Sequence, residues 1–380
     1  MYGIRQALSR FLTGISPAFL AVSLFLLLPS SSRAESFAYQ DLHPAGWISS
    51  VARCVNDAGE VVGYGLTPQG ERGFAWSGGI FLEILPPGAD SARAAWVNGM
   101  GEIAGTGTTD GVPHAFLLKD GTYRDPTPGW GWSEATYVGE DGSVAGRGWY
   151  GGDTVVFVSR DSVVEIFPGF TSVAGGNRSG QWVGSSGSSS RLYIPGQGYL
   201  DVTPPGAATS TPHGINDSGL IAGAALRSGA MKGYVKSGEF YIDMNPPGWT
   251  SSQATGINDY NEVVGYGESG SGTRSFLRVG GSIEEIVFPG WTSTEAASLN
   301  NAGQVAGSGT TAEGRTHAFL ASPPVPASPG NPSLPQGPGA AGGCSVAGTS
   351  QPADPYAASA AAGLWILSLF LIRRAGRIRR

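Results

Sequence analysis

The sequence predicts an all-β fold, a seven-bladed β-propeller built from four-stranded blades, and three observations predict it. The first is a pattern written seven times in 380 residues: a polar turn, a Val-Val-Gly-like segment and a His-Ala-Phe-Leu-like tetrad. A period near 40 residues is typical of a unit that buries its apolar face by stacking on copies of itself. The turns begin at Asn56, Asn98, Gly139, Asn177, Asn216, Asn258 and Asn300.

The second observation is the content of each unit. Its apolar runs are short, rich in β-branched and aromatic residues, and lack helical periodicity, which favours four antiparallel strands. In the fifth unit we expect strands at Thr209–Ile215, Leu220–Gly223, Lys232–Val235 and Phe240–Met244, with turns at Asn216–Gly219 and Ser237–Gly238.

The residue types of the turns fit this interpretation. Asparagine tolerates the left-handed region and bonds its own backbone, and glycine supplies a positive φ without steric cost. Asn261 replaces the turn glycine in the sixth unit, which is the substitution that this backbone accepts best.

The third observation is the phase of the array. Phe37–Leu42 resembles a fourth strand with no blade before it, and His317–Leu320 a third strand with no fourth after it. Pairing the two would close the ring and remove its open edges. The alternative is an open β-solenoid, which would need capping repeats.

The composition excludes one class of partner and indicates the role of a cysteine. Residues 36–320 carry 15 lysines and arginines against 27 aspartates and glutamates, so we expect no nucleic-acid partner. The two cysteines, Cys54 and Cys344, lie in unlike contexts, and we expect Cys54 to be a small buried residue without a disulfide.

Residues 1–34 are predicted to be a signal peptide. Arg5 and Arg10 precede an apolar run, and Ala34 ends a stretch of the kind that signal peptidase accepts. A retained membrane anchor is the alternative, but the apolar run is short for a span. The mature chain is then expected to begin near Glu35, with the propeller at residues 35–321.

The His-Ala-Phe-Leu tetrads at His114 and His317, with Ile-Asn-Asp at Ile215 and Ile257, carry a resemblance. Residues 36–320 resemble the extracellular HAF-repeat family of bacterial proteins, although the third and fourth units depart from the tetrad. The resemblance implies an exported bacterial or archaeal surface protein and brings no established reaction or catalytic residues.

The C-terminal residues divide into three parts. Residues 322–343 form a Pro/Gly-rich linker, and residues 344–380 hold Cys344, an apolar segment at 357–372 and then Arg373 and Arg374. This order resembles the C-terminal sorting tails of the CTERM kind, of the JDVT and MYXO types. It implies a transmembrane helix with its arginines in the cytoplasm, cleavage by a sorting protease, and Cys344 as either a processing or lipid-attachment point or a bystander.

The sequence holds no His-Glu-x-x-His, no phosphate loop and no Cys-x-x-Cys. His114 and His317 share one repeat position, which holds them apart, so we expect no metal site, and turn chemistry accounts for the Asn-Asp pairs without calcium. No cofactor is predicted.

The loops between blades are the candidate ligand site. Trp47, Trp130, Trp249 and Trp291 follow glycine at one repeat position, where Phe170, Ala89 and Ala207 stand in the other units. A ring of aromatics on this rim could bind sugars or a protein, or each ring could instead pack as a wedge between blades. The least regular loop on the rim adds Trp149, Tyr150 and Asp153.

We therefore expect a secreted or cell-surface, non-catalytic binding scaffold whose ligand is a glycan or a surface protein. Its further partners would be the export machinery and, through the C-terminal helix, the membrane. One alternative is a secreted propeller enzyme, a polysaccharide lyase or hydrolase, with acids such as Asp153 and Glu268 converging over the channel. The other is a surface-layer component without a discrete ligand.

Overall fold

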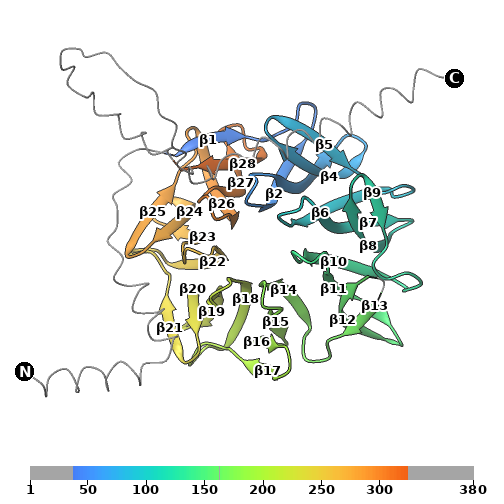
Figure 1. Ribbon diagram of the computed structural model, residues 1–380. Coiled ribbons are helices and arrows are strands. Elements are labelled where there is room, and N and C mark those ends of the chain that lie inside the picture. The colour runs from blue at the N-terminus through green and yellow to red at the C-terminus, as the bar shows by residue number, and fades with distance from the viewer. Residues whose placement is uncertain (1–36, 162, 324–380) are drawn as a thin grey trace, which may run out of the picture. The chain divides into compact units, whose positions relative to one another are not determined.

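The computed structural model describes residues 37–161 and 163–323, which form seven antiparallel four-stranded sheets around a central channel (Figure 1). The predicted all-β, seven-bladed propeller is confirmed. The predicted signal peptide, sorting tail and transmembrane segment lie outside the described residues. Within the described part of the chain, no helix is long and apolar enough to cross a membrane.

The blades follow one another in chain order. Blade 1 holds β2 (Ser49–Val55), β3 (Val61–Thr67), β4 (Gly70–Ser77) and β5 (Ile80–Ile84). Blade 2 holds β6 (Ser91–Val97), β7 (Ile103–Thr109), β8 (Val112–Lys119) and β9 (Thr122–Arg124). Blade 3 holds β10 (Ser133–Val138), β11 (Val144–Tyr150), β12 (Asp153–Arg160) and β13 (Val163–Ile166). Blade 4 holds β14 (Ser172–Gly176), β15 (Trp182–Ser186), β16 (Ser189–Ile194) and β17 (Gly198–Asp201).

The last three blades repeat this order. Blade 5 holds β18 (Thr209–Ile215), β19 (Ile221–Arg227), β20 (Ala230–Ser237) and β21 (Phe240–Asp243). Blade 6 holds β22 (Ser251–Ile257), β23 (Val263–Ser269), β24 (Gly272–Val279) and β25 (Ser282–Ile286). Blade 7 holds β26 (Trp291–Leu299), β27 (Val305–Thr311), β28 (Thr316–Ser322) and, as its fourth strand, β1 (Ala38–Asp41).

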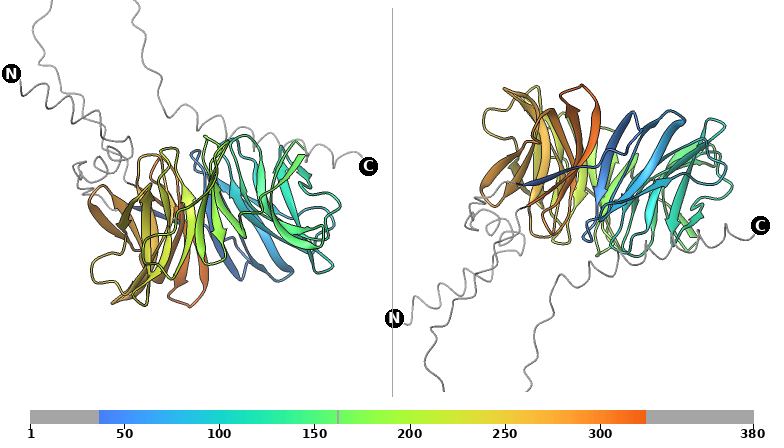
Figure 2. Two further views of the ribbon diagram at one scale, coloured as in Figure 1. Left: turned by 90° about the horizontal axis from the view of Figure 1, so that it is seen from below. Right: turned by 90° about the horizontal axis from the view of Figure 1, so that it is seen from above.

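The ring closes through its two ends. β1 pairs antiparallel with β28, with Ala38 opposite Ser322 and Asp41 opposite Phe319. In Figure 2 the dark blue β1 lies against the orange strands of blade 7. The predicted closure is therefore confirmed, and the open solenoid is excluded.

The fifth unit shows how far the strand boundaries were predictable. Its first strand has the predicted bounds, but its second runs on to Arg227, because β19 pairs along its whole length with β20. The turn after β20 is shifted by one residue: Ser237 still pairs with Phe240, so the two-residue turn is Gly238-Glu239.

Every first strand bulges at the same position of the repeat, and a glycine of the second strand lies against that bulge; β26 has a further bulge between Trp291 and Ser293. The register shifts between Ala254 and Gly256 in blade 6, for example, and a Cβ on Gly265 would lie 1.9 Å from the Gln253 carbonyl oxygen. The same close approach occurs at Gly63, Gly105, Gly146, Gly184, Gly223 and Gly307. The glycine of the Val-Val-Gly segment is thus required by backbone contact.

The core lies between neighbouring blades. One cluster joins Phe74 and Val61 of blade 1 to Ala306 and Leu320 of blade 7. Six further clusters follow the ring. Cys54 belongs to the cluster of blades 1 and 2 and is 2% exposed, which confirms that it is a small buried residue. This core positions the first strands around the channel.

Candidate functional site in the channel and on its rims

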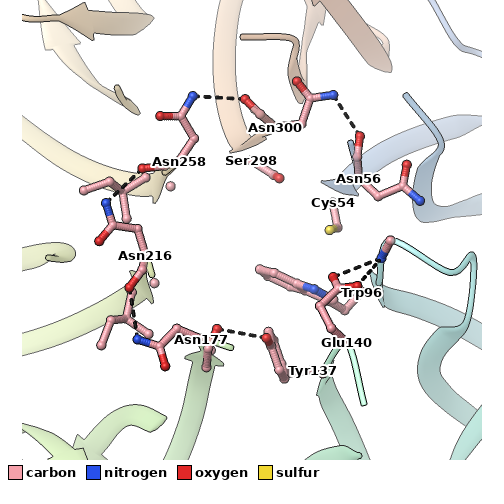
Figure 3. A pocket seen from close by; sticks show the side chains of 18 of the residues that line it. Cys54, Asn56, Trp96, Tyr137, Glu140, Asn177, Asn216, Asn258, Ser298 and Asn300 are labelled. Atoms are coloured by element: carbon pink, nitrogen blue, oxygen red, sulfur yellow. Dashed lines mark hydrogen bonds between the residues drawn. The ribbon is translucent and has the colours of Figure 1, made fainter. Parts of the chain in front are cut away.

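The polar turns connect the blades to one another. Each of six asparagine side chains donates from Nδ2 to the main-chain oxygen at the same position of the next blade, at 2.8 to 3.1 Å. Figure 3 shows the bonds made by Asn177, Asn216, Asn258 and Asn300. The Oδ1 atom of Asn56 also accepts from the main-chain N–H groups of Ala58 and Glu60. We call this inter-blade series the asparagine ring; its members are Asn56, Asn98, Asn177, Asn216, Asn258 and Asn300.

This geometry corrects one explanation. None of these six asparagines has a positive φ; the left-handed residue is the fourth of each turn, such as Gly59 with φ 77° and Asn261 with φ 63°. Asparagine is present because its amide can accept within its own turn and donate to the next blade. The prediction that Asn261 takes the place of the turn glycine is confirmed.

Blade 3 interrupts the asparagine ring. Gly139 stands at the asparagine position and has no amide to donate. The Tyr137 hydroxyl takes over this link and donates to the Gly176 main-chain oxygen at 2.9 Å (Figure 3). The junction between blades 3 and 4 is therefore held by a phenol.

A second series of contacts surrounds the mouth of the channel. The main-chain N–H of Asn301 donates to Asp57, and that of Asp217 donates to Asp259, across blade junctions. Arg178 bonds Asp217 through both its main-chain N–H and its guanidinium, each at 2.9 Å. The mouth is mainly acidic, since the groups of the cavity wall that carry charge are Asp57, Glu140, Asp141, Asp217, Asp259, Arg160 and Arg178.

Inside this mouth lies a cavity of about 470 Å³. Its wall is uneven because the residue after the bulge differs between blades. The seven residues at this position are Cys54, Trp96, Tyr137, Gly175, Gly214, Gly256 and Ser298. Blades 1 to 3 thus carry side chains, aromatic in two of them, where blades 4 to 6 carry glycine. Figure 3 shows the Trp96 indole reaching toward the middle of the cavity.

Three further titratable groups of the cavity wall, Cys54, Tyr137 and His213, have pKa values shifted toward their neutral forms. Burial raises the pKa of the Cys54 thiol to about 12, and burial likewise raises the pKa of Tyr137. Burial lowers the pKa of His213, whose Nδ1 lies 2.9 Å from the Ala254 main-chain oxygen. A carbonyl can only accept, so Nδ1 carries the proton and Nε2 is the acceptor.

The predicted ligand residues lie elsewhere, at the opposite mouth, because the first strands run from the Trp-bearing loops to the polar turns. The predicted ligand residues Trp47, Trp130, Trp149, Tyr150, Asp153, Trp249 and Trp291 are all absent from the cavity wall. The loops are equivalent as predicted: the main-chain N–H of Trp47 bonds Pro44, and the same turn recurs at Ala89, Trp130, Phe170, Ala207, Trp249 and Trp291.

The four loop tryptophans pack against the blade that follows them. Trp249 is 7% exposed and meets Phe276 edge to face. Trp47, Trp130 and Trp291 are half-buried and meet Phe74, Phe157 and Phe319 in the same way. A Cβ on Gly65 would lie 2.1 Å from the Ser49 main-chain oxygen and 2.6 Å from Trp47, which explains the second glycine of the repeat. Packing therefore accounts for the repeated tryptophan.

Blade 3 differs from this pattern. Trp149 and Tyr150 are 44% and 55% exposed, and the Tyr150 ring stacks on Trp130 at 4.9 Å between centroids. Trp132 lies beside them, with the Arg147 guanidinium 6.0 Å from its ring. We call Trp130, Trp132, Trp149 and Tyr150 the blade-3 aromatic surface. Asp153 is exposed at its edge, opposite Tyr150 in the hairpin.

The two acids considered for an enzyme lie on different blades, Asp153 on blade 3 and Glu268 on blade 6. Glu268 interacts electrostatically with Glu295 of blade 7, a residue that the repeat pattern does not indicate. Burial raises the pKa of Glu295, and the negative charge of Glu268 raises it further.

A histidine pair was also missed. The rings of His43 and His317 stack at 3.8 Å between centroids, where β28 meets the segment that follows β1. His317 Nδ1 contacts Asp41 at 2.8 Å, and His43 contacts Ser50 and the Trp47 main-chain oxygen. Repeat spacing could not reveal this pair, since His43 lies outside the repeated pattern. In residues 37–161 and 163–323, no group of three His, Cys, Asp or Glu side chains is placed to hold a metal ion.

The predicted processing residues Ala34, Cys344, Arg373 and Arg374 all lie outside the described residues. Nothing in the structure bears on the cleavage or anchoring assigned to them.

No family model matches the chain, and no curated protein matches it. Among solved structures, the chain is similar to the β-propeller domain of the Trilobed protease from Pyrococcus furiosus, at 11% identity and a TM-score of 0.52, covering 73% of this chain and 94% of that one. It is also similar to YCF48 bound to D1 peptide, at 16% identity and a TM-score of 0.50, covering 79% and 99%.

A third similar structure is a puromycin-hydrolyzing peptidase of Mycobacterium tuberculosis, at 13% identity and a TM-score of 0.51, covering 81% of this chain and 52% of the peptidase. The first of these propellers is described as having an open velcro topology, whereas this chain closes through β1 and β28. At these identities the comparisons establish the fold: the chain is a β-propeller.

Proposed function

We propose that the protein is an exported, non-catalytic binding propeller that holds a glycan or a surface protein on its blade-3 aromatic surface. The observation that carries this proposal is the exposure of Trp149 and Tyr150, at 44% and 55%. Large exposed aromatics that lie together are characteristic of binding surfaces.

The comparison between blades supports a role beyond packing. The residues equivalent to Trp149 and Tyr150 are Leu66 and Thr67 in blade 1, and Glu268 and Ser269 in blade 6. Those blades complete the same fold without aromatic side chains at these positions. The aromatic pair of blade 3 is therefore not a requirement of the propeller.

The protonation of Cys54 and the contacts of His213 in the channel support a non-catalytic role. A thiol is a nucleophile only as the thiolate, and burial keeps Cys54 protonated by raising its pKa to about 12. His213, whose pKa burial lowers, contacts the Ala254 main-chain oxygen rather than an activating carboxylate.

The proposal also includes the cellular location of the protein. The signal-peptide pattern of residues 1–34, the HAF-repeat resemblance and the tail of residues 344–380 support a prokaryotic protein that is exported and then held at or released from the membrane. Its partners in that process are the export machinery and a sorting protease, and the acidic propeller gives no reason to expect nucleic acid. Mass spectrometry of the exported protein tests this: a mature N-terminus near Glu35 is expected, whereas an intact N-terminus contradicts it.

Binding can be tested with the propeller, residues 35–323, which carries its own core and closes on itself through β1 and β28. Surface plasmon resonance against immobilised glycans, cell-wall fractions and exported proteins should find a ligand whose affinity falls at least about tenfold in a Trp149→Ala, Tyr150→Ala double variant. Leu66→Ala is the matched control, since Leu66 is equally exposed at the equivalent position of blade 1. Equal loss in the control, or no loss in the double variant, contradicts the proposal.

The alternative function is hydrolysis or lyase chemistry on a polysaccharide, and one observation favours it. Glu295 and Glu268 interact electrostatically, and burial raises the pKa of Glu295, as a general acid requires. A turnover assay on any polysaccharide that binds separates the two functions. Turnover that Glu295→Gln abolishes would establish the enzyme, whereas binding without turnover supports the scaffold.

A further inference from the structure

We infer that the channel cavity is a second binding site, for the end of a neutral glycan, at the mouth opposite the blade-3 aromatic surface. This inference does not rest on the proposed function. The two sites share no residue and lie on different rims, so each can fail without the other.

The first argument is unused space. Gly175 and Gly214 stand where blades 1 to 3 carry Cys54, Trp96 and Tyr137. A Cβ on Gly214 would meet no atom within 4 Å, and one on Gly175 would make ordinary contacts of 3.7 and 4.0 Å. Neither residue has a positive φ. Packing therefore does not require glycine at these two positions. Gly223, which lies in blade 5 with Gly214, differs, because its Cβ would lie 2.4 Å from a main-chain oxygen.

Glycine also carries a cost at this place. It weakens a strand because it loses more backbone entropy on folding and brings no side chain to pack. A position that accepts a larger residue but holds glycine keeps volume open. In the channel, that volume belongs to the same cavity that the Trp96 indole lines, and Figure 3 shows this indole reaching toward the middle of the cavity.

The second argument is the set of polar atoms left without partners. The Trp96 indole N–H makes no hydrogen bond within the described residues, and Trp96 lines the cavity. His213 also lines it, and only its Nδ1 has a partner, so Nε2 remains as an acceptor. One donor and one acceptor beside an aromatic ring can together bind a ring that carries hydroxyl groups.

The charge of the wall selects a neutral ligand. Below the mouth the titratable side chains that line the cavity are Cys54, Tyr137 and His213, and the pKa of each is shifted toward its neutral form; the charge of Arg53, which does not line the cavity, acts on Cys54 and His213. At the mouth, acids outnumber arginines, so an anionic ligand is repelled. The carboxylates of Asp57, Asp217 and Asp259 can accept from sugar hydroxyls that extend outward.

The size agrees with one or two sugar rings. Sites for small molecules commonly enclose about 300–1,000 Å³, and this cavity encloses about 470 Å³. A folded protein domain cannot enter it. The chemistry on the wall therefore fits the exposed end of a glycan chain.

The test is calorimetric titration of the propeller with N-acetylglucosamine and cellobiose as neutral probes, and with glucuronic acid as an anionic one. We expect at least one neutral probe to bind, and glucuronic acid to bind at least about tenfold more weakly. Gly214→Leu should fill the cavity and abolish binding while the melting temperature is kept or raised. Gly270→Leu is its control, because Gly270 also borders open space but lies outside the cavity.

A second variant guards against misfolding of the first. Trp96→Phe keeps a ring between the blades and removes the N–H donor, so affinity should fall about tenfold. Tyr260→Ser, 68% exposed on the same face but outside the cavity, should leave it unchanged. Absence of binding by both neutral probes, equal binding of glucuronic acid, or binding that survives both Gly214→Leu and Trp96→Phe would overturn the inference.

Discussion

The side-chain amide of Asn300 donates to the main-chain oxygen of Asn56 at 2.8 Å, across the seam where the last blade meets the first. The same bond recurs at five other junctions, so a local turn residue also determines contacts over the whole ring. Four predictions test this and related features of the fold.

Asn300→Ala is expected to lower the free energy of unfolding by about 1–3 kcal/mol, because it leaves buried main-chain groups without partners. Asn300 is 3% exposed, so water cannot replace the amide. Urea denaturation measures the change. Tyr260→Ser, in the corresponding turn of blade 6 but exposed, should change stability by less than about 0.5 kcal/mol. A similar loss in both variants would show that the asparagine ring has no special role.

Gly265→Ala is expected to destabilise the propeller by about 2–3 kcal/mol, because the new Cβ would lie 1.9 Å from the Gln253 main-chain oxygen. Thermal unfolding followed by circular dichroism measures it. Gly270→Ala in the neighbouring hairpin meets no atom within 4 Å and serves as the control. A Gly265→Ala protein as stable as the control would refute the close approach at the bulge.

The seam should weaken in acid. Burial lowers the pKa of His43 below 6.5, and the positive charge of His317 lowers it further. The negative charge of Asp41 raises this pKa, and the positive charge of Arg315 lowers it. Below about pH 6.5 the folded protein then binds fewer protons than the unfolded chain, so the stability present above that pH is lost as the pH falls from about 6.5 toward the lower pKa of His43 in the folded state.

The measurement is the urea midpoint as a function of pH. His43→Gln should flatten the decline below about pH 6.5, and His213→Gln should do so separately, because burial also lowers the pKa of His213. A decline that is unchanged in the His43 variant would assign the acid sensitivity to other groups.

Cys54 should be inert while the protein is folded. Burial raises its pKa to about 12, so the thiolate is scarce at pH 8. In a Cys344→Ser background, Ellman's reagent should label the native protein at least about a hundredfold more slowly than the urea-unfolded protein. Rapid labelling of the native protein would contradict the buried, protonated thiol.

Most of the fold was predictable because each turn and strand of the repeat is determined by residues close together in the sequence. The turn at Asn216–Gly219 and the strand at Thr209–Ile215 are encoded by residues within a few positions of each other. Closure was predictable from phase, since Phe37–Leu42 and His317–Leu320 each lacked a partner. The end of β19 was not predictable, because pairing with β20 rather than its own composition extends it to Arg227.

The candidate sites were less predictable. The repeated tryptophans indicated a rim of ligand-binding aromatics, but contacts such as Trp249 with Phe276 show that they complete the blades. What distinguishes Trp149 is its exposure, which a sequence does not state. The cavity could not be predicted from the sequence, because it is formed by Gly175, Gly214 and Trp96 together. These residues belong to different blades and come together only in three dimensions.

Because β1 pairs with β28, the ring can close only after the chain has been synthesised as far as Ser322. β1 leaves the ribosome before any blade exists and has no partner until Thr316–Ser322 has followed it. A product that stops earlier keeps an unpaired strand at one end and an incomplete sheet at the other, both of which proteases and aggregation exploit. The closed ring thereby distinguishes finished molecules from truncated ones without any separate checkpoint.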